Sequence, residues 1–150
     1  MSRIPKLVIR DMQTDDIPSV LEIEQRSFSC PWSREIFLHE LCKKFSLLKV
    51  AEFERAVIGY LCADYFAHES NILDLAVHPD FRRQGVATRL MDEAVGELKQ
   101  KGCVFLHLKV RVSNTGAQKF YEHLGFVTEG VRKNYYEKPD EDALQMMGRV

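Results

Sequence analysis

Hydrophobic and polar positions follow first a strand period and then a helix period at the start of the chain. The segment LVIRDM near residue 7 has the apolar content of a strand, and Thr14 with the two aspartates after it is a typical helix start. An apolar stripe on that predicted helix is formed by Ile17, Val20, Leu21 and Phe28. A second helix is expected from Ser33, with an apolar side made of Ile36, Phe37 and Leu41.

Three apolar segments rich in β-branched and aromatic residues come next, and they predict an antiparallel meander. Their sequences are SLLKVAEF, AVIGYLCADYFA and NILDLAVHP. Glu54 and Arg55 form the expected tight turn between the first two segments. Pro79 cannot donate a backbone hydrogen bond to a neighbouring strand, so we expect the third strand to end there and HPDFRRQG to be a loop.

The second half of the chain alternates between helix and strand. A long helix is predicted up to Gly102 by the spacing of Val86, Leu90, Met91, Ala94, Val95 and Leu98. The strand CVFLHLKVR and a short helix follow, the helix capped by Ser113 or Asn114 and ended by Gly125. The acidic turn EKPDED joins the last two strands, FVTEGVRKNYY and ALQMMGRV. This order predicts an α/β (α+β) fold in which helices cover the faces of a mixed sheet.

Composition and charge limit the class of protein. The chain has 150 residues, of which 45% are hydrophobic, which predicts one domain over residues 1–150 with a core that needs no metal or disulfide. Lys and Arg total 21 against 22 Asp and Glu, so the whole-molecule field of a nucleic-acid-binding protein is missing. The longest stretch without a charged residue runs only from Ala56 to Ala63, which excludes a spanning helix and a membrane partner.

The cysteines predict a reducing compartment. Cys30, Cys42, Cys62 and Cys103 lie far apart without a CxxC pair, and MSRIPKLVIRD has no apolar signal-peptide run. We therefore expect buried, reduced thiols and a cytoplasmic location. No metal is predicted, because Cys103 and His107 have no second ligand pair at a recognised spacing. The sequence specifies no oligomeric state.

A basic, glycine-containing segment before the long predicted helix is a candidate phosphate site. A helix start leaves N–H groups without partners and carries partial positive charge, so a turn there can encircle a phosphate. Gly85 permits a close backbone approach, Ala87 is small, and the arginines add charge. The candidate residues are Arg82, Arg83, Gln84, Gly85, Val86, Ala87 and Thr88. The alternative is a solvated basic turn at an ordinary helix; GxxxxGK[ST] and GxGxxG are both absent.

Two spaced motifs give the chain a resemblance to a known family. Arg-x-x-Gly-x-Ala after an apolar-Ala-Val-x-Pro run, together with VRVSNTGAQKFYEHLGF, resembles the GNAT superfamily of N-acyltransferases over essentially the whole chain. The resemblance implies a mixed, mostly antiparallel central sheet of about seven strands with four helices on its faces. It also implies acetyl-CoA as co-substrate, with Asn114 on the pantetheine arm, Tyr121 at the thioester sulfur, and backbone contacts from Leu75, Ala76 and Val77.

A closer likeness exists within that superfamily. IEQRSF with CPWS, LAVHPDFRRQG, and RKNYY followed by EDALQM resemble the RimI-type protein N-terminal acetyltransferases. That resemblance implies acetyl transfer from acetyl-CoA to the N-terminal alanine of a small-subunit ribosomal protein. An acetyltransferase for a small-molecule amine and a non-catalytic acyl-CoA-binding module remain open as alternatives.

Tyr121 is the candidate general acid. An amine attacks a thioester only in its neutral form, and the departing thiolate leaves more readily when a nearby group donates a proton. The family motif gives that role to Tyr121. The alternative is a core residue, because a single helical stripe is formed by Ala117, Phe120, Tyr121 and Leu124.

The candidate general base departs from the family pattern. Lys109 stands where the family usually has a glutamate, and a lysine cation accepts no proton. One account needs no strong base, because about a tenth of an α-amine is neutral at pH 7 and the Lys109 charge favours that form. A second account uses Asp74, expected on the same strand face as Ile72 and Ala76, with a structural ion pair to Lys109 as its alternative. His107 points to the same side as Lys109 and is either a proton relay or a packed side chain.

Aromatic residues are candidates for the walls of a peptide groove. Trp32, Tyr135 and Tyr136 offer rigid contact area with polar ends. Glu24 or Glu137 is a candidate for attracting a cationic chain terminus. Each of these residues also has a structural interpretation, as core edge or solvated face.

Overall fold

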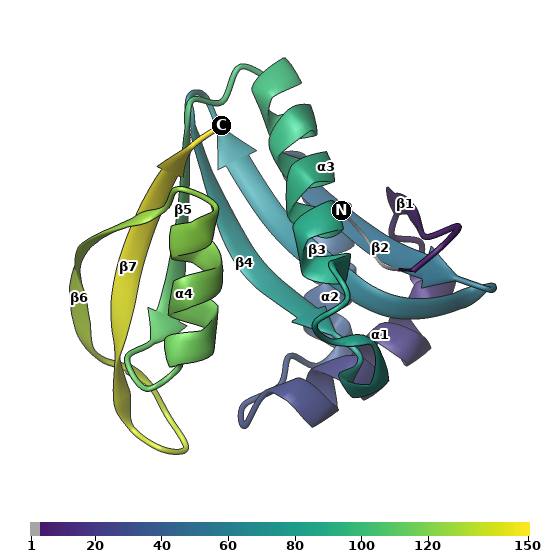
Figure 1. Ribbon diagram of the computed structural model, residues 1–150, viewed down its shortest axis with the longest axis horizontal. Helices are drawn as coiled ribbons and strands as arrows, with labels where there is room; N and C mark the ends of the chain where they lie inside the picture. The colour runs from purple at the N-terminus through teal and green to yellow at the C-terminus, as the bar shows by residue number, and fades with distance from the viewer. Residues whose placement is uncertain (1–3) are drawn as a thin grey trace.

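A mixed sheet organises the fold (Figure 1). The computed structural model describes residues 4–150, and within them the sheet has seven strands in the order β1-β2-β3-β4-β5-β7-β6. The strands are β1 (Val8–Asp11), β2 (Ser46–Phe53), β3 (Ala56–Phe66), β4 (Glu69–Val77), β5 (Phe105–Arg111), β6 (Val127–Tyr136) and β7 (Glu141–Arg149). Of the neighbouring pairs, β4 and β5 are parallel and the others antiparallel. The predicted mixed, mostly antiparallel sheet is confirmed.

The predicted meander is also confirmed, and its first turn has the expected chemistry. β2 and β3 pair antiparallel up to Phe53 and Ala56, with Glu54 and Arg55 between them. Both turn residues have positive φ, 49° and 66°, as the tightest hairpin turns require. The 3-10 helix η2 (Pro79–Phe81) follows β4, so the strand ends where Pro79 predicts.

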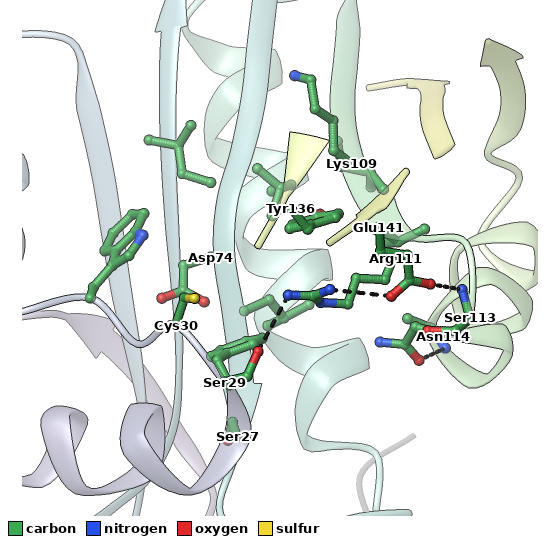
Figure 2. A pocket seen from close by; sticks show the side chains of 18 of the residues that line it. Ser27, Ser29, Cys30, Asp74, Lys109, Arg111, Ser113, Asn114, Tyr136 and Glu141 are labelled. Carbon is green, nitrogen blue, oxygen red and sulfur yellow. Dashed lines mark hydrogen bonds and ion pairs between the residues drawn. The ribbon is translucent and has the colours of Figure 1, made fainter. Parts of the chain in front are cut away.

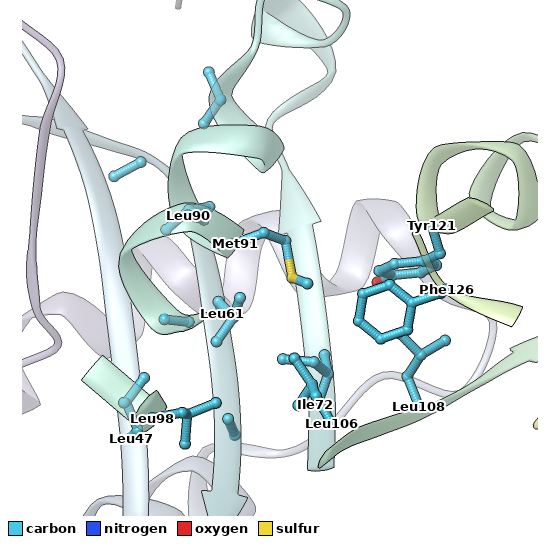
Figure 3. Packing of buried hydrophobic residues seen from close by; sticks show 14 of the residues in the cluster. Leu47, Leu61, Ile72, Leu90, Met91, Leu98, Leu106, Leu108, Tyr121 and Phe126 are labelled. Carbon is cyan, nitrogen blue, oxygen red and sulfur yellow. The ribbon is translucent and has the colours of Figure 1, made fainter. Parts of the chain in front are cut away.

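Helices cover both faces of the sheet. In the described chain they are α1 (Ile17–Ser27), preceded by the 3-10 helix η1 (Thr14–Asp16), α2 (Arg34–Cys42), α3 (Val86–Gln100) and α4 (Thr115–His123). One buried cluster lies between the sheet and α1 with α2, and a larger one lies under α3 and α4. In the larger cluster Leu90 and Met91 project from α3 toward the sheet, and Tyr121 lies with Phe126 over Leu108 (Figure 3).

The predicted apolar stripes of α1 and α2 are wrong at one residue each. Phe28 follows the end of α1 and is 39% exposed, and Ile36 on α2 is 41% exposed. Burial in α1 continues instead through Ile23 and Glu24, both almost fully enclosed. A carboxylate therefore occupies a position in the apolar stripe.

β4 and β5 diverge after a short paired stretch, and this divergence opens the sheet. Among the described residues they pair only from Glu69 with Phe105 to Asn71 with His107, and the two strands then separate toward the carboxyl end of β5 (Figure 1). The edge of β4 from Leu73 onward therefore has no strand partner on the β5 side. A gap in the sheet leaves backbone groups available to a ligand.

A β-bulge at Leu73 reorients the end of β4. Ile72 pairs with Ala63 but Asp74 pairs with Cys62, so Leu73 is an extra residue opposite β3. Ile72 consequently packs in the α3 and α4 cluster, whereas Ala76 packs in the α1 and α2 cluster. The prediction that Asp74 shares a face with Ile72 is wrong, because the bulge turns Asp74 toward α1.

Two further expectations concern the burial of the cysteines and the presence of a membrane-spanning helix. All four cysteines lie in the described range and are free, but Cys30 and Cys42 are exposed, so the expectation of burial holds only for Cys62 and Cys103. No helix formed by residues 4–150 has both the length and the apolar content to cross a membrane.

Candidate functional site

A cavity of about 500 Å³ lies where β4 and β5 separate. Its walls come from the end of α1, the α1–α2 loop, β4, β5, α4 and the β6–β7 loop (Figure 2). This volume is in the usual range of small-ligand sites. The predicted site residues in its lining are Glu24, Trp32, Asp74, Leu75, Lys109, Asn114, Tyr121 and Tyr136. Segments that are distant in sequence thus meet at one concave site.

Tyr121 is a packed core residue, and it also lines the cavity. It is 7% exposed and packs edge-on against Phe120 and Phe126, with ring centroids 5.1 and 5.6 Å away. Burial, with the charge of Asp74 adding to it, raises the pKa of the Tyr121 phenol well above its usual range. The phenol is therefore protonated at neutral pH and is available as a donor.

Asn114 joins the cavity to the start of α4. Its side-chain oxygen accepts a hydrogen bond from the Ala117 N–H at 3.1 Å, so Asn114 and not Ser113 caps the helix. Because the cap uses the oxygen, the side-chain NH₂ group of Asn114 remains a possible donor to a ligand.

The basic segment has the backbone conformation of an anion site. Gly85 precedes α3 with a φ of 83°, and Arg83 also has a positive φ of 62°. The long helix α3 then presents its first N–H groups at this turn. Arg82 holds the turn to its neighbours, donating from Nε to the Val77 carbonyl at 3.0 Å and from Nη2 to Ser27 Oγ at 3.3 Å.

The side chains of residues 82–88 differ in burial. Arg83 is exposed, whereas Val86 is buried in the core under α3. A ligand at this turn would therefore meet backbone N–H groups and arginines, not the Val86 side chain. Residues 82–88 do not line the cavity, and neither do Ala76 and Val77. The segment lies beyond the end of β4, beside the cavity.

Lys109 and Asp74 do not form the ion pair that adjoining strands would allow. Lys109 Nζ lies over the Tyr135 ring, 5.5 Å from its centroid, and Figure 2 shows the lysine directed away from Asp74. The physical reason is the divergence of β4 and β5, which begins before both residues. The alternative in which Asp74 forms a structural ion pair with Lys109 is therefore wrong.

Asp74 instead faces another carboxyl group. Glu24 of α1 is 2% exposed, Asp74 is 8% exposed, and both line the cavity. Burial, together with the nearby Glu24 carboxyl, raises the pKa of Asp74 to about 10. The sequence does contain a signal that Glu24 is buried, because Glu24 follows Ile17 and Val20 at helical spacing. An acidic residue therefore occupies a position in an apolar stripe.

Arg111 links the two loops at the cavity mouth. The sequence did not identify it as a site residue. Nη1 donates to the Pro139 carbonyl at 2.9 Å and to Glu141 at 3.2 Å. Nη2 donates to the Glu137 carbonyl at 2.7 Å. It also donates to Ser29 Oγ at 3.3 Å, a contact drawn in Figure 2. One guanidinium thus joins the α1–α2 loop to the β6–β7 loop.

The predicted aromatic walls lie at different depths. Trp32 lines the cavity and packs on Phe37, 5.2 Å between centroids. Tyr136 lines it under the Arg111 guanidinium, and burial raises the pKa of Tyr136 to about 12. Tyr135 is 50% exposed and outside the lining.

Two remaining candidates have structural contacts. Glu137 contributes its backbone carbonyl, which accepts from Arg111. His107 lies between Glu69, with Nε2 3.0 Å from a carboxylate oxygen, and Glu129, and is not in the cavity lining. Among residues 4–150, no group of three His, Cys, Asp or Glu side chains has the geometry to hold a metal ion.

Comparison with known proteins agrees with this geometry. The family model described as Acetyltransferase (GNAT) family matches residues 17–126. The chain belongs to the GNAT acetyltransferase family. The predicted family is thereby confirmed, and the matched residues of this GNAT acetyltransferase run from α1 to the end of α4.

Relatives of this GNAT acetyltransferase align over nearly its whole length. A Bacillus subtilis (strain 168) protein is 37% identical over 142 residues, which cover 94% of each chain. The [ribosomal protein bS18]-alanine N-acetyltransferase of Salmonella typhimurium is 34% identical and covers 90% of this chain and 92% of its own. The crystal structure of the ribosomal-protein-S18-alanine N-acetyltransferase from Escherichia coli superposes with a TM-score of 0.89 at 32% identity, covering 96% of this chain and 94% of that chain.

Proposed function

We propose that this acetyltransferase moves the acetyl group of acetyl-CoA to the N-terminal α-amine of a protein, with the N-terminal alanine of ribosomal protein bS18 as its acceptor. The observation that carries the proposal is the cavity between β4 and β5, which brings Tyr121 and Asn114 together with Trp32 and Tyr136. The names of relatives at 32–34% identity support the acceptor. A ribosomal acceptor implies that the enzyme works in the cytoplasm.

Residues of this chain fit acetyl-CoA along the open edge of β4. The turn at Gly85 and the start of α3 would hold the pyrophosphate, with Arg83 adding positive charge. The unpaired β4 edge around Leu75 would meet the pantetheine amides, and Asn114 would donate from its amide. Together these groups lead from the basic turn to Tyr121.

The chemistry assigned to Tyr121 is proton donation. The neutral amine attacks the thioester carbonyl, a C–N bond forms, the C–S bond breaks, and the nitrogen loses one proton to solvent. Tyr121 donates its proton to the departing thiolate and then regains a proton from solvent. Its raised pKa keeps the proton on the phenol until the thiolate appears.

The charges at the site favour an α-amine over a lysine side chain. About a tenth of an α-amine is neutral at pH 7, against well under a thousandth of a lysine amine. Lys109 lines the cavity as a second cation, which disfavours a permanently charged acceptor beside it. The acceptor that needs the least help in losing its proton is therefore a protein N-terminus.

A peptide panel tests the proposed function. Purified protein, acetyl-CoA and acceptor are mixed, and released thiol is measured; the acceptors are peptides that begin with alanine, the same peptides with blocked N-termini, and polyamines. We expect turnover only with free N-termini. Turnover with polyamines alone would favour a small-amine acetyltransferase, and acetyl-CoA binding without any turnover would favour a non-catalytic binding module.

Arg111→Lys is expected to raise KM for the peptide about tenfold while changing the Kd of acetyl-CoA less than about twofold. A lysine cannot reproduce the forked contacts that join Ser29 to the carbonyls of Glu137 and Pro139, and each hydrogen bond to a charged group contributes roughly 1.5 to 3 kcal/mol. Steady-state kinetics and calorimetry measure the two constants. Arg132→Lys, exposed on β6, is the matched control. Equal effects in both variants would contradict the role of Arg111 at the cavity mouth.

A further inference from the structure

Glu24 and Asp74 bring two carboxyl groups into contact at the cavity wall. Glu24 comes from α1 and Asp74 from β4, where the bulge at Leu73 turns it toward α1. Both residues line the same cavity and are more than nine-tenths buried, and the Tyr60 hydroxyl binds Glu24 while Cys62, two residues further along β3, pairs with Asp74. Two buried carboxyl groups this close together do not both ionise, so one of them holds a proton.

Hydrogen-bond partners decide which group is charged. Glu24 accepts from the Tyr60 hydroxyl on one oxygen, at 2.5 Å, and from the Trp32 N–H on the other, at 2.9 Å. Glu24 is the acceptor in both contacts, so neither contact places a proton on it. At Asp74 the Leu75 N–H favours the charged form but burial outweighs it, and the buried Oδ2 has no hydrogen-bond partner among the described residues. The shared proton therefore lies on Asp74, and the pair carries one negative charge.

The other ionisable groups around Asp74 are neutral at pH 7. Burial raises the pKa of Tyr60 and Cys62 on β3 and of Tyr121 on α4. Lys109 on β5 is directed over Tyr135 instead. None of these groups therefore adds a charge beside Asp74. The charge at this wall of the cavity is the single negative charge of the Glu24 and Asp74 pair.

We propose that Glu24 and Asp74 act together as the proton acceptor for the amine, which replaces the carboxylate missing at Lys109. An N–H bond of the ammonium breaks as an O–H bond forms on Asp74, and the original Asp74 proton moves to Glu24. The ammonium becomes a neutral amine and the pair changes from one negative charge to none. This inference rests on the proposed function, since it supplies the base for the same reaction.

The size of the effect follows from the amine. An α-amine with a pKa near 7.7 to 8.0 is about one-tenth neutral at pH 7 and almost wholly neutral at pH 9. Loss of the acceptor pair should therefore lower kcat/KM about tenfold at pH 7 and less than about twofold at pH 9. A residue with only a structural role would lower activity equally at both pH values.

The test compares Glu24→Gln, Asp74→Asn and the double variant with the wild type, using a free alanine N-terminus at pH 7 and pH 9. Glutamine at 24 can accept from Trp32 and donate to Tyr60, and asparagine at 74 can donate to Glu24, so both variants keep hydrogen bonds. Glu40→Gln on α2 is the matched control, because Glu40 is equally buried and contacts Lys43 outside the cavity. Acetyl-CoA binding and thermal unfolding verify that each variant is folded.

The expected result is a tenfold loss at pH 7 in each single variant, the same loss in the double variant, and recovery at pH 9. An infrared band of a protonated carboxyl at pH 7, absent in Asp74→Asn, is expected whether or not the enzyme turns over. Unchanged kinetics in Glu24→Gln, or a missing infrared band in the wild type, would contradict the proton-acceptor role of the pair. The proposed function would still stand. A wild type inactive on every free N-terminus would overturn the proposed function and, with it, the catalytic role of the pair.

Discussion

Tyr121→Phe is expected to lower kcat about 100-fold or more while the Kd of acetyl-CoA stays within about twofold of the wild type. General acid catalysis by a positioned side chain typically contributes roughly 10² to 10⁴ in rate. Phenylalanine keeps the edge-on packing on Phe120 and Phe126, so the substitution removes the proton and little else. Presteady-state and steady-state measurements of thiol release determine kcat, and calorimetry determines the Kd.

A second tyrosine separates the acid role from a general cost of losing a hydroxyl. Tyr65→Phe changes a residue of β3 that packs against Phe45 outside the cavity, and its kcat should equal that of the wild type. If Tyr121→Phe and Tyr65→Phe have the same kcat, Tyr121 is not the acid and its burial is purely structural.

Stability should fall as pH rises, and Asp74→Asn should remove most of that dependence. The folded-state pKa of Asp74, about 10, exceeds the ordinary value near 3.9, so between these values the folded state binds a proton that the unfolded state has released. The free energy of unfolding then decreases by up to about 1.4 kcal/mol for each pH unit. Because asparagine is neutral at every pH, Asp74→Asn should be more stable than the wild type at pH 8 and similar to it near pH 4.

Urea unfolding at pH 5.5, 7 and 8 measures this dependence in both proteins. Glu40→Gln should retain the wild-type slope, since Glu40 is paired with Lys43. Parallel curves for the wild type and Asp74→Asn would mean that Asp74 is ionised in the folded state. The higher stability expected of Asp74→Asn measures how much the buried Asp74 carboxyl destabilises the wild type. Loss of stability for the sake of function is common at functional sites.

Local sequence signals predicted most of the elements because the chain follows them consistently. The turn at Glu54 and Arg55, the end of β4 before Pro79, and the cap at Asn114 all depend on residues close together in sequence. Their physical causes, a tight hairpin, a missing backbone donor and a side-chain acceptor, act within a few positions. Such features need no tertiary information.

The features that shape the site depend on tertiary contacts, and the sequence did not predict them. The bulge at Leu73 changes which face Asp74 occupies, and strict alternation along a strand cannot reveal one extra residue. Glu24 was a candidate for attracting a cationic chain terminus, but its position beside Asp74 of β4 was not predicted. Arg111 contacts Ser29, 82 residues away in sequence, and Glu137, 26 residues away, so its role required the fold.

The most direct test of the central claim uses one peptide that contains both a free N-terminal alanine and an internal lysine. The peptide is incubated with the enzyme and acetyl-CoA at pH 7, and mass spectrometry locates the acetyl group. Because the neutral fractions of the two amines differ by roughly 100-fold or more, acetylation of the α-amine should exceed that of the lysine by at least about 100-fold. Acetyl groups mainly on the lysine, or a peptide left unmodified, would contradict N-terminal acetylation as the function of this protein.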